Sequence, residues 1–210
     1  MLNQNTGMLH FTSDLRISRG FLLTVAAAAI LASPVVAGAA TTDTTVSTTI
    51  SAIISVFTSN GTVNANVLPT VSGAQTIASD TVTVSTNDAA GYTLKLEDAD
   101  ATTSLASGAN NITATAGTQA APVGLTAGKW GYRVDGLGGF GAGPTSGASN
   151  TAIGAITFAG VPASGSPNTL KTTSSLATND TTSVWYSVAA DATQPVGTYT
   201  DIVTYTALTN

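Results

Sequence analysis

The feature that most constrains this chain is a strict alternation of apolar and other residues, which recurs along much of its length. In 92–97, 130–135 and 183–188, a large apolar side chain occupies every second position, and mostly polar residues lie between. A period of two is that of a β-strand with one face in a core. These segments are rich in threonine and valine and are separated by Asn, Asp, Gly and Pro clusters. They predict an all-β fold, an antiparallel β-sandwich of Ig-like or jelly-roll-like type.

Two further segments are expected to form the first and last strands. Residues 44–57 alternate between apolar residues and Ser or Thr and carry no charge. Residues 198–208 are apolar on both faces, as in a central strand. The first strand has no Lys, Pro or bulge to protect it at a sheet edge. It either pairs within its own sheet, which is the default expectation, or completes the sheet of another copy by strand addition.

Residues 1–39 have the pattern of a secretory signal peptide. Two arginines precede an apolar run over 21–32, and the small residues Ala37 and Ala39 fit a cut before Ala40. A positive flank, a short apolar stretch and a small-residue cleavage site together predict export. We therefore expect the protein to be secreted or held at the cell surface.

Two other interpretations of the leader stay open. An uncleaved membrane anchor would need about 20 apolar residues, and Pro34 interrupts the run. A pilin leader would be cut after Gly20, although Val25 stands where such leaders usually carry glutamate. With cleavage, a signal helix precedes residues 40–210, which we expect to form a single β-sandwich domain. The membrane is an expected partner only through an uncleaved leader.

The composition excludes several classes of function. Charged residues make up 8% of the chain, against roughly 25% in an ordinary soluble domain. Acidic residues outnumber basic ones by 11 to 6, so phosphate is repelled and nucleic acid is not an expected partner. There is no cysteine, and His10, the one histidine, lies in the leader. This removes His-based triads, thiol nucleophiles, zinc sites of Cys or His, and haem ligation. We expect neither enzymatic activity nor a cofactor.

A glycine-rich motif has a simpler interpretation than nucleotide binding. Residues 136–141 match the pattern G-x-G-x-x-G. A dinucleotide site needs the third glycine to open a helix, but more glycines and Pro144 follow it. We interpret 137–150 as a long uncharged surface loop. Recognition there would depend on backbone groups, hydroxyls and Phe140.

Two further features are candidate binding sites. Glu97, Asp98 and Asp100 place three carboxylates at a strand exit, enough oxygen to be weak calcium candidates. No known calcium-loop spacing surrounds them, so a solvated acidic turn is the alternative. Trp185 lies on the serine face of its strand. It is either exposed, where it could stack on a sugar ring or a partner chain, or covered by a second core layer or a loop.

Four segments carry a resemblance to a known group of proteins. They are Trp-Gly-Tyr-Arg-Val-Asp-Gly at 130–136, Val-Pro-Ala-Ser-Gly-Ser-Pro at 161–167, Lys-Thr-Thr at 171–173, and 179–186, where Asn-Asp precedes Val-Trp-Tyr. They resemble uncharacterised secreted β-sandwich surface proteins of small-genome candidate-phylum bacteria. The likeness covers most of 46–210 and implies export, but it implies no activity.

A weaker resemblance concerns residues 195–201, Pro-Val-Gly-Thr-Tyr-Thr-Asp. Pro and Gly make a turn, and the body of Tyr199 is expected to pack while its hydroxyl ties a corner. The segment resembles the start of the last strand in spore-coat-U-type pilus subunits and WxL cell-wall domains. The Trp-x-Leu motif of the WxL family is absent, so peptidoglycan binding is not implied.

Together these features predict a secreted, non-enzymatic cell-surface protein with a structural or adhesive role. Its expected partners are further copies of itself or surface glycans. A carbohydrate-binding module is one alternative, with Trp185 as the stacking residue. A pilus-like filament subunit assembled by strand addition is the second alternative.

Overall fold

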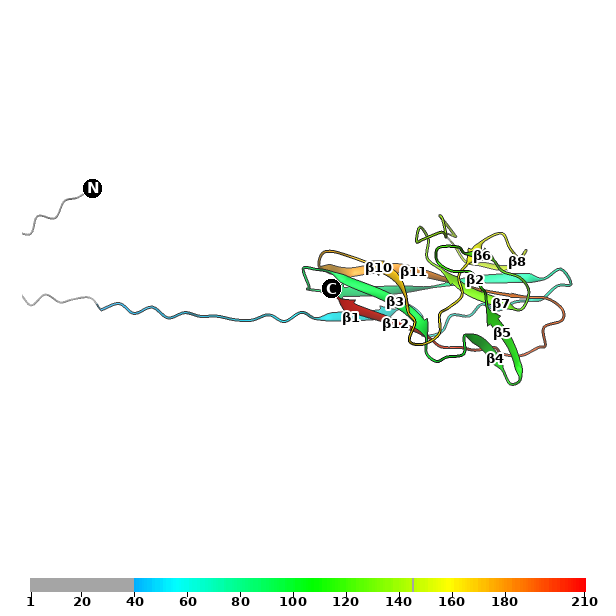
Figure 1. Cartoon of the computed structure of the whole chain (residues 1–210), viewed down its shortest axis with the longest axis horizontal. Coiled ribbons are helices and arrows are strands. Elements are labelled where there is room, and N and C mark those ends of the chain that lie inside the picture. Colours follow the sequence, from blue (N-terminus) through cyan, green and yellow to red (C-terminus); the bar gives the residue numbers. More distant parts are fainter. Residues whose placement is uncertain (1–39, 145) are drawn as a thin grey trace, which may run out of the picture. The chain divides into compact units, whose positions relative to one another are not determined.

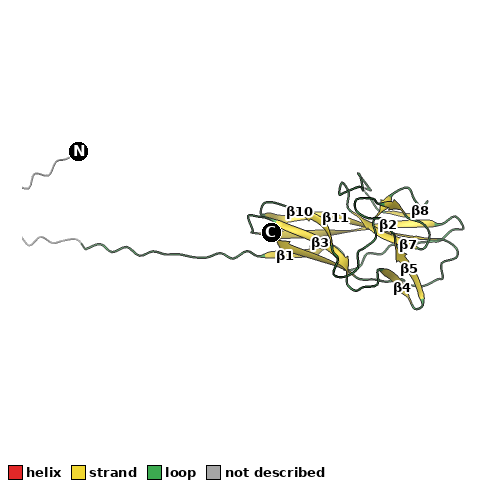
Figure 2. Ribbon diagram, in the orientation of Figure 1, coloured by secondary structure: helices red, strands yellow, loops and turns green. Residues whose placement is uncertain are grey.

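The strands lie in one compact unit of the chain. The computed structural model describes residues 40–144 and 146–210 (Figure 1), and the chain divides into Met1–Thr48 and Thr49–Asn210. The described strands all lie in the second unit. The described residues form strands and no helix (Figure 2), which confirms the all-β class. The predicted signal peptide and signal helix lie in 1–39, outside the described residues.

No helix in the described part of the chain is long and apolar enough to span a membrane.

The largest sheet is built around two long strands. β2 (Ala74–Thr86) and β11 (Ala177–Ala190) pair antiparallel over most of their length. The strands that extend this sheet are β1 (Ile54–Thr58), β4 (Ser104–Ser107), β5 (Asn110–Ala114), β7 (Lys129–Arg133) and β8 (Ala148–Thr151). Their order is β1-β2-β11-β7-β5-β4, with β8 also paired to β2. β5 and β7 run parallel, unlike the antiparallel pairing expected.

A smaller sheet shares a core with the first. It contains β3 (Tyr92–Asp98), β10 (Asn168–Thr172) and β12 (Val203–Thr209), in the antiparallel order β10-β3-β12. Alternate residues of β3 are fully buried, as the pattern at 92–97 predicts. They belong to one buried cluster with residues of the larger sheet, among them Val82, Val84, Trp130, Tyr132, Val184 and Tyr186. The two sheets therefore bury one apolar core between them.

The opposite face of the larger sheet carries a second core. β6 (Val123–Gly124) and β9 (Thr157–Phe158) form a two-stranded ribbon. Phe158 of this ribbon is fully buried. It belongs to a cluster with Ile77, Leu125, Trp185 and Ala189. The central strand β11 is therefore covered on both faces, which is why it tolerates apolar residues at successive positions.

The first strand is much shorter than predicted. The expectation of a strand over 44–57 is wrong for most of that length, because β1 begins at Ile54. Ile54 lies opposite Thr86, the last residue of β2. The residues before it continue past the end of the neighbouring strand, so they have no ladder to join.

The last strand is at an edge. β12 pairs with β3 on one side and is the end strand of its sheet, so the prediction of a central position is wrong. Its apolar composition indicates a strand with two neighbours, whereas the fold of one chain supplies one.

The segment before β12 forms the predicted tyrosine corner. The Tyr199 hydroxyl donates to the carbonyl of Pro195 at 2.7 Å, and Gln194 Nε2 donates to that hydroxyl at 2.9 Å. The ring packs against the main core. A Cβ at Gly197 would meet the side chain of Ser107, so the chain passes close to β4 at this bend. This corner fixes the point where the chain enters β12.

Candidate functional site

Trp185, a candidate sugar or partner contact, is buried in the second core. Its exposed fraction is 8%, and it clusters with Leu125 and Phe158. The exposed interpretation is wrong because the β6–β9 ribbon covers this face, and the alternative of a second core layer is correct. Its indole Nε1 has no hydrogen-bond partner among the described residues. Packing alone therefore holds this side chain.

Phe140, the other candidate contact, is also buried, with an exposed fraction of 4%. Its ring meets Tyr132 edge-on with centroids 6.0 Å apart, and the guanidinium of Arg133 lies 5.7 Å from its centroid. Arg133 also donates to the carbonyls of Phe140 and Gly141, at 2.9 and 3.2 Å. Phe140 is therefore not presented to solvent, because Arg133 of β7 holds this part of the loop against the core.

Two neighbouring glycines of the G-x-G-x-x-G segment, Gly138 and Gly139, pack closely against the backbone of residues 119–120. Gly138 has a positive φ of 57°, and a Cβ there would collide with the carbonyl of Gln119. Gly139 N donates to the same carbonyl at 2.7 Å. The segment opens no helix, as its sequence indicates. Its backbone amides therefore serve the loop's own contacts and are not arranged around a phosphate.

The three carboxylates at the exit of β3 point to different partners. Glu97 Oε2 accepts a hydrogen bond from Gly165 N at 2.6 Å, and Asp100 Oδ1 accepts from Thr102 N at 2.6 Å. Asp98 is fully buried, so the solvated turn is also wrong for this residue. Within 40–144 and 146–210, no group of three or more His, Cys, Asp or Glu side chains could hold a metal ion. The calcium candidate therefore gains no support from the geometry.

Asp98 lies instead against Asp201, which precedes β12. The carboxyl of Asp98 is among the groups that raise the pKa of Asp201, and the Oδ2 atom of each residue is buried with no hydrogen-bond partner in the described residues. The Oδ1 atoms do have hydrogen-bond partners. Asp98 Oδ1 accepts from Asp100 N at 3.0 Å, and Asp201 Oδ1 accepts from Ile202 N at 2.8 Å. A proton on Asp201 would turn its carboxyl into a hydrogen-bond donor and remove the charge repulsion from Asp98.

The environment raises the affinity of Asp201 for a proton. Burial raises the pKa of Asp201 from its usual 3.8 to about 6, with the carboxyls of Asp98 and Asp100 adding to the effect and a hydrogen bond from Ile202 opposing it. The folded protein therefore binds this proton more tightly than the unfolded chain does. The resulting stabilisation is complete below pH 3.8 and is lost as the pH rises through about 6.

We expect Asp201→Asn to stabilise the protein at pH 7 by about 1 kcal/mol, a figure reduced because Asp201 is partly exposed to solvent. The amide can donate to Asp98 Oδ2 without needing a proton. Urea unfolding at pH 4 and pH 7 measures both effects: the wild type loses stability between them, and the variant loses less. Asp43→Asn, on an exposed residue, is the control. An equal pH dependence in the wild type and Asp201→Asn would contradict the raised proton affinity of Asp201 in the folded protein.

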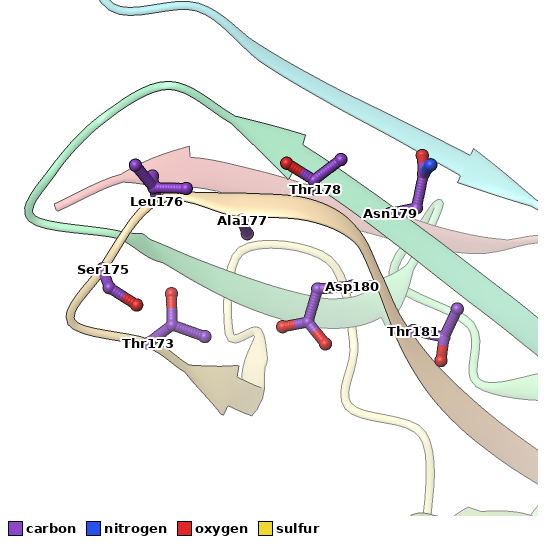
Figure 3. Close-up of a pocket in the computed structure, with 8 residues that line it drawn as sticks. All are labelled: Thr173, Ser175, Leu176, Ala177, Thr178, Asn179, Asp180 and Thr181. Carbon is purple, nitrogen blue, oxygen red and sulfur yellow. The ribbon is translucent and has the colours of Figure 1, made fainter.

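A shallow hollow of about 410 Å³ lies at the start of β11 (Figure 3). Asp180 is the charged residue of its lining. Its carboxylate accepts from Lys171 Nζ at 2.6 Å and from the Tyr92 hydroxyl at 2.9 Å. Burial works to raise the pKa of Asp180, but these two hydrogen bonds outweigh it and the pKa is lowered. A carboxylate with these contacts links β3, β10 and β11 and is a poor general base.

A second hollow, of about 350 Å³, lies where the chain enters β1. Ile53, Asn87 and Leu176 are among its lining residues. Asn87 Oδ1 accepts from Ile53 N at 2.8 Å, and its Nδ2 donates to Ser51 O at 3.1 Å. The side chain of Asn87 thus takes the place of a neighbouring strand for a short distance. It holds the residues just before β1 in an extended form.

The residues before β1 form the most unusual surface of the described chain. We call residues 44–53 the N-terminal segment. They are exposed throughout, and Val46, Ile50 and Ile53 have exposed fractions of 91%, 82% and 69%. No residue of the segment is charged. Exposed β-branched residues in a row, without charge or proline, are what natural proteins avoid unless another chain covers them.

Comparison with known proteins finds no matching family model, curated protein or solved structure. The sequence did not single out Asp201 or Asn87, because their partners are distant along the chain. Asn87 could have been suspected from its place directly after an alternating segment, where Asn often bonds to backbone. Nothing in the sequence pairs Asp201 with Asp98.

Proposed function

We propose that this is a secreted, non-enzymatic cell-surface protein with a structural role, and that its copies assemble by strand addition. The observation that supports this most is the exposed, alternating and uncharged N-terminal segment, 44–53. It would become the new N-terminal region after cleavage before Ala40. A structural subunit needs no catalytic group, in keeping with the lack of histidine and cysteine after the leader.

The energetics of the N-terminal segment favour a partner strand. Burying a side chain of the size of Val or Ile contributes roughly 1.5–3 kcal/mol, and the segment exposes three of them, Val46, Ile50 and Ile53. Its backbone would also gain a ladder of hydrogen bonds on joining a sheet edge. Strand addition obtains affinity from the main chain and specificity from alternate side chains. The period-two pattern of the segment suits that mode.

We infer further that the domain is a β-sandwich of the Ig-like kind. The buried cluster shared by the two larger sheets supports this, as does the hydrogen-bonded corner at Tyr199. Both fit the proposed relation to secreted surface proteins of candidate-phylum bacteria. The carbohydrate-binding alternative is weakened, since both tryptophans of the chain, Trp130 and Trp185, are buried.

The experiment uses the full chain, expressed with its own leader and collected after export. Mass spectrometry is expected to give an N-terminus at or near Ala40. Light scattering is expected to show multimers, and negative-stain electron microscopy to show how they are arranged. A monomeric exported protein at every concentration tested would overturn the proposed assembly.

The double substitution Val46→Lys and Ile50→Lys is expected to weaken assembly about a hundredfold, because two apolar contacts are lost and two charges must be desolvated. Both positions are exposed in the single chain, so the thermal midpoint of the monomer should not change. Val196→Lys is the matched control, since Val196 is a fully exposed valine outside the segment. Unaltered multimers in the double variant would contradict a role for the segment.

A further inference from the structure

β12 has the sequence of an inner strand and the position of an outer one. Between Val203 and Thr209 it carries apolar residues on both faces and no charge or proline. Its pairing with β3 shows no bulge. Leu208, on its outer face, and Ile202, just before it, are 48% and 70% exposed. The devices that usually protect a sheet edge are therefore missing from this strand.

The free hydrogen-bonding groups of β12 can be assigned from its ladder. Asn210 N donates to Gly91 O, and Ile202 O accepts from Ala99 N, so even-numbered residues face β3. In an antiparallel pair the backbone groups of alternate residues point in opposite directions. Those of Val203, Tyr205 and the other odd-numbered residues therefore point away from β3. None of them has a hydrogen-bond partner in the part of the chain that the structure describes.

The core beneath β12 is also incompletely covered. Val203, Tyr205 and Ala207 pack against the main cluster but are only half-buried. The matching residues of β3, such as Leu94 and Leu96, are fully buried. The difference follows from position, since β3 has a neighbour on each side. One more strand next to β12 would complete this end of the core.

The other sheet edges are less suitable. The edge of β10 carries Lys171, whose Nζ is held by Asp180, and a register shift after Thr169. Gln119 Nε2 also donates to the carbonyl of Thr169 at 3.0 Å. The edge of β4 is closed by a bridge between Ala106 and Thr200. β1 offers five residues and lies beside β12 (Figure 1), with no backbone hydrogen bond between them in the described chain.

We infer that the outer edge of β12 is the acceptor, and that its partner is the N-terminal segment, 44–53, of a second copy of this chain. This inference depends on the proposed strand addition and names the surface that receives the strand. Donor and acceptor are both uncharged and β-branched, so no charge is buried when they meet. The donor is long enough to pair with all of Val203–Thr209. Each bound copy still presents its own β12 or its own segment, so the contact is head-to-tail and can repeat.

Ala207→Pro tests the acceptor. The amide of Ala207 points outward, so proline there removes a donor needed by an added strand and spares the ladder with β3. We expect assembly of the exported protein to weaken about tenfold or more. Thr172→Pro is the matched control on β10, at the opposite edge of the same sheet: Thr173 N donates to Tyr92 O, so the amide of Thr172 also points outward. This control is expected to assemble as the wild type does.

A cross-linking measurement tests the acceptor edge independently, in case the proline substitution disturbs folding. The chain has no cysteine, so single cysteines can be placed without interference. Copies with Ile50→Cys are mixed with copies with Thr204→Cys on β12 and treated with a short bis-maleimide, which tolerates a small register offset. We expect a covalent dimer from this mixture and little from Ile50→Cys with Thr172→Cys.

The outcomes separate this inference from the proposed function. Loss of assembly in Ala207→Pro, with cross-linking to Thr204→Cys, supports both. If Val46→Lys with Ile50→Lys abolishes multimers but Ala207→Pro does not, or if the cross-link forms at position 172, the acceptor is wrong while strand addition stands. A monomeric wild type overturns both. A link within one chain, in a dilute copy carrying both Ile50→Cys and Thr204→Cys, overturns the inference in favour of intramolecular pairing.

Discussion

Replacing Arg133 with methionine is expected to destabilise the folded protein by about 3–5 kcal/mol. Arg133 is 2% exposed, and its guanidinium makes four contacts to oxygen: Asp135 Oδ1 and the carbonyls of Phe140, Gly141 and Thr157. Methionine fills some of the space but leaves these acceptors without a donor. Because Arg133 joins the 137–150 loop to β9, we expect that loop to detach first. The thermal midpoint should fall by about 10 °C or more, and urea unfolding measures the free energy directly.

Lys171→Met is the matched control for this experiment. It removes the other ion pair of the described chain, Lys171 to Asp180, in which both side chains are about one-third exposed. Water can replace the lysine there, so we expect a loss of about 1 kcal/mol or less. Similar losses in the two variants would contradict the structural role assigned to Arg133.

Alternation in the sequence predicted those strands that bury one face in the core and leave the other face more exposed. β3 is the clearest case, because Tyr92, Leu94 and Leu96 are fully buried and Thr93 and Lys95 are not. The tyrosine corner was also predictable, since its hydroxyl reaches a carbonyl only four residues earlier. Short-range geometry of this kind can be predicted from residue type and spacing.

The remainder depends on contacts between distant segments. Phe140 and Trp185 lie in segments that look exposed from their neighbours, yet the fold covers both. The same alternation that predicted a strand over 44–57 could not show that β2 ends at Thr86, and a strand cannot form without a partner. Asp98 and Asp201 are brought together only because β12 returns to pair with β3.

The edge position of β12 is the most informative failure. Its apolar composition predicted a neighbour on each side, and the single chain provides one. A short, uncharged N-terminal segment without a partner strand is present in the same chain. If the second neighbour comes from another copy, the prediction from composition was correct for the assembly and wrong for the monomer. The Ala207→Pro experiment therefore also tests whether a strand from another copy explains the apolar composition of β12.

Trp185→Ala is expected to destabilise the protein by about 3–5 kcal/mol, the usual cost of removing a buried tryptophan. The indole fills the space between β11 and the β6–β9 ribbon, together with Leu125 and Phe158. Each strand of the ribbon is only two residues long. The ribbon therefore depends on the contact with Trp185 to stay packed against β11. Urea unfolding measures the loss, and hydrogen exchange is expected to show early opening of the ribbon.

Trp185→Phe separates packing from recognition. The indole Nε1 has no partner among the described residues, so phenylalanine gives up no hydrogen bond and retains much of the apolar volume. We expect it to cost less than half as much as alanine, on the order of 1–2 kcal/mol. A glycan-binding tryptophan would behave in the opposite way: alanine would abolish binding on a glycan array while leaving stability almost unchanged. Large loss of stability on alanine, partial rescue by phenylalanine and no glycan signal from the wild type would together assign Trp185 to the core.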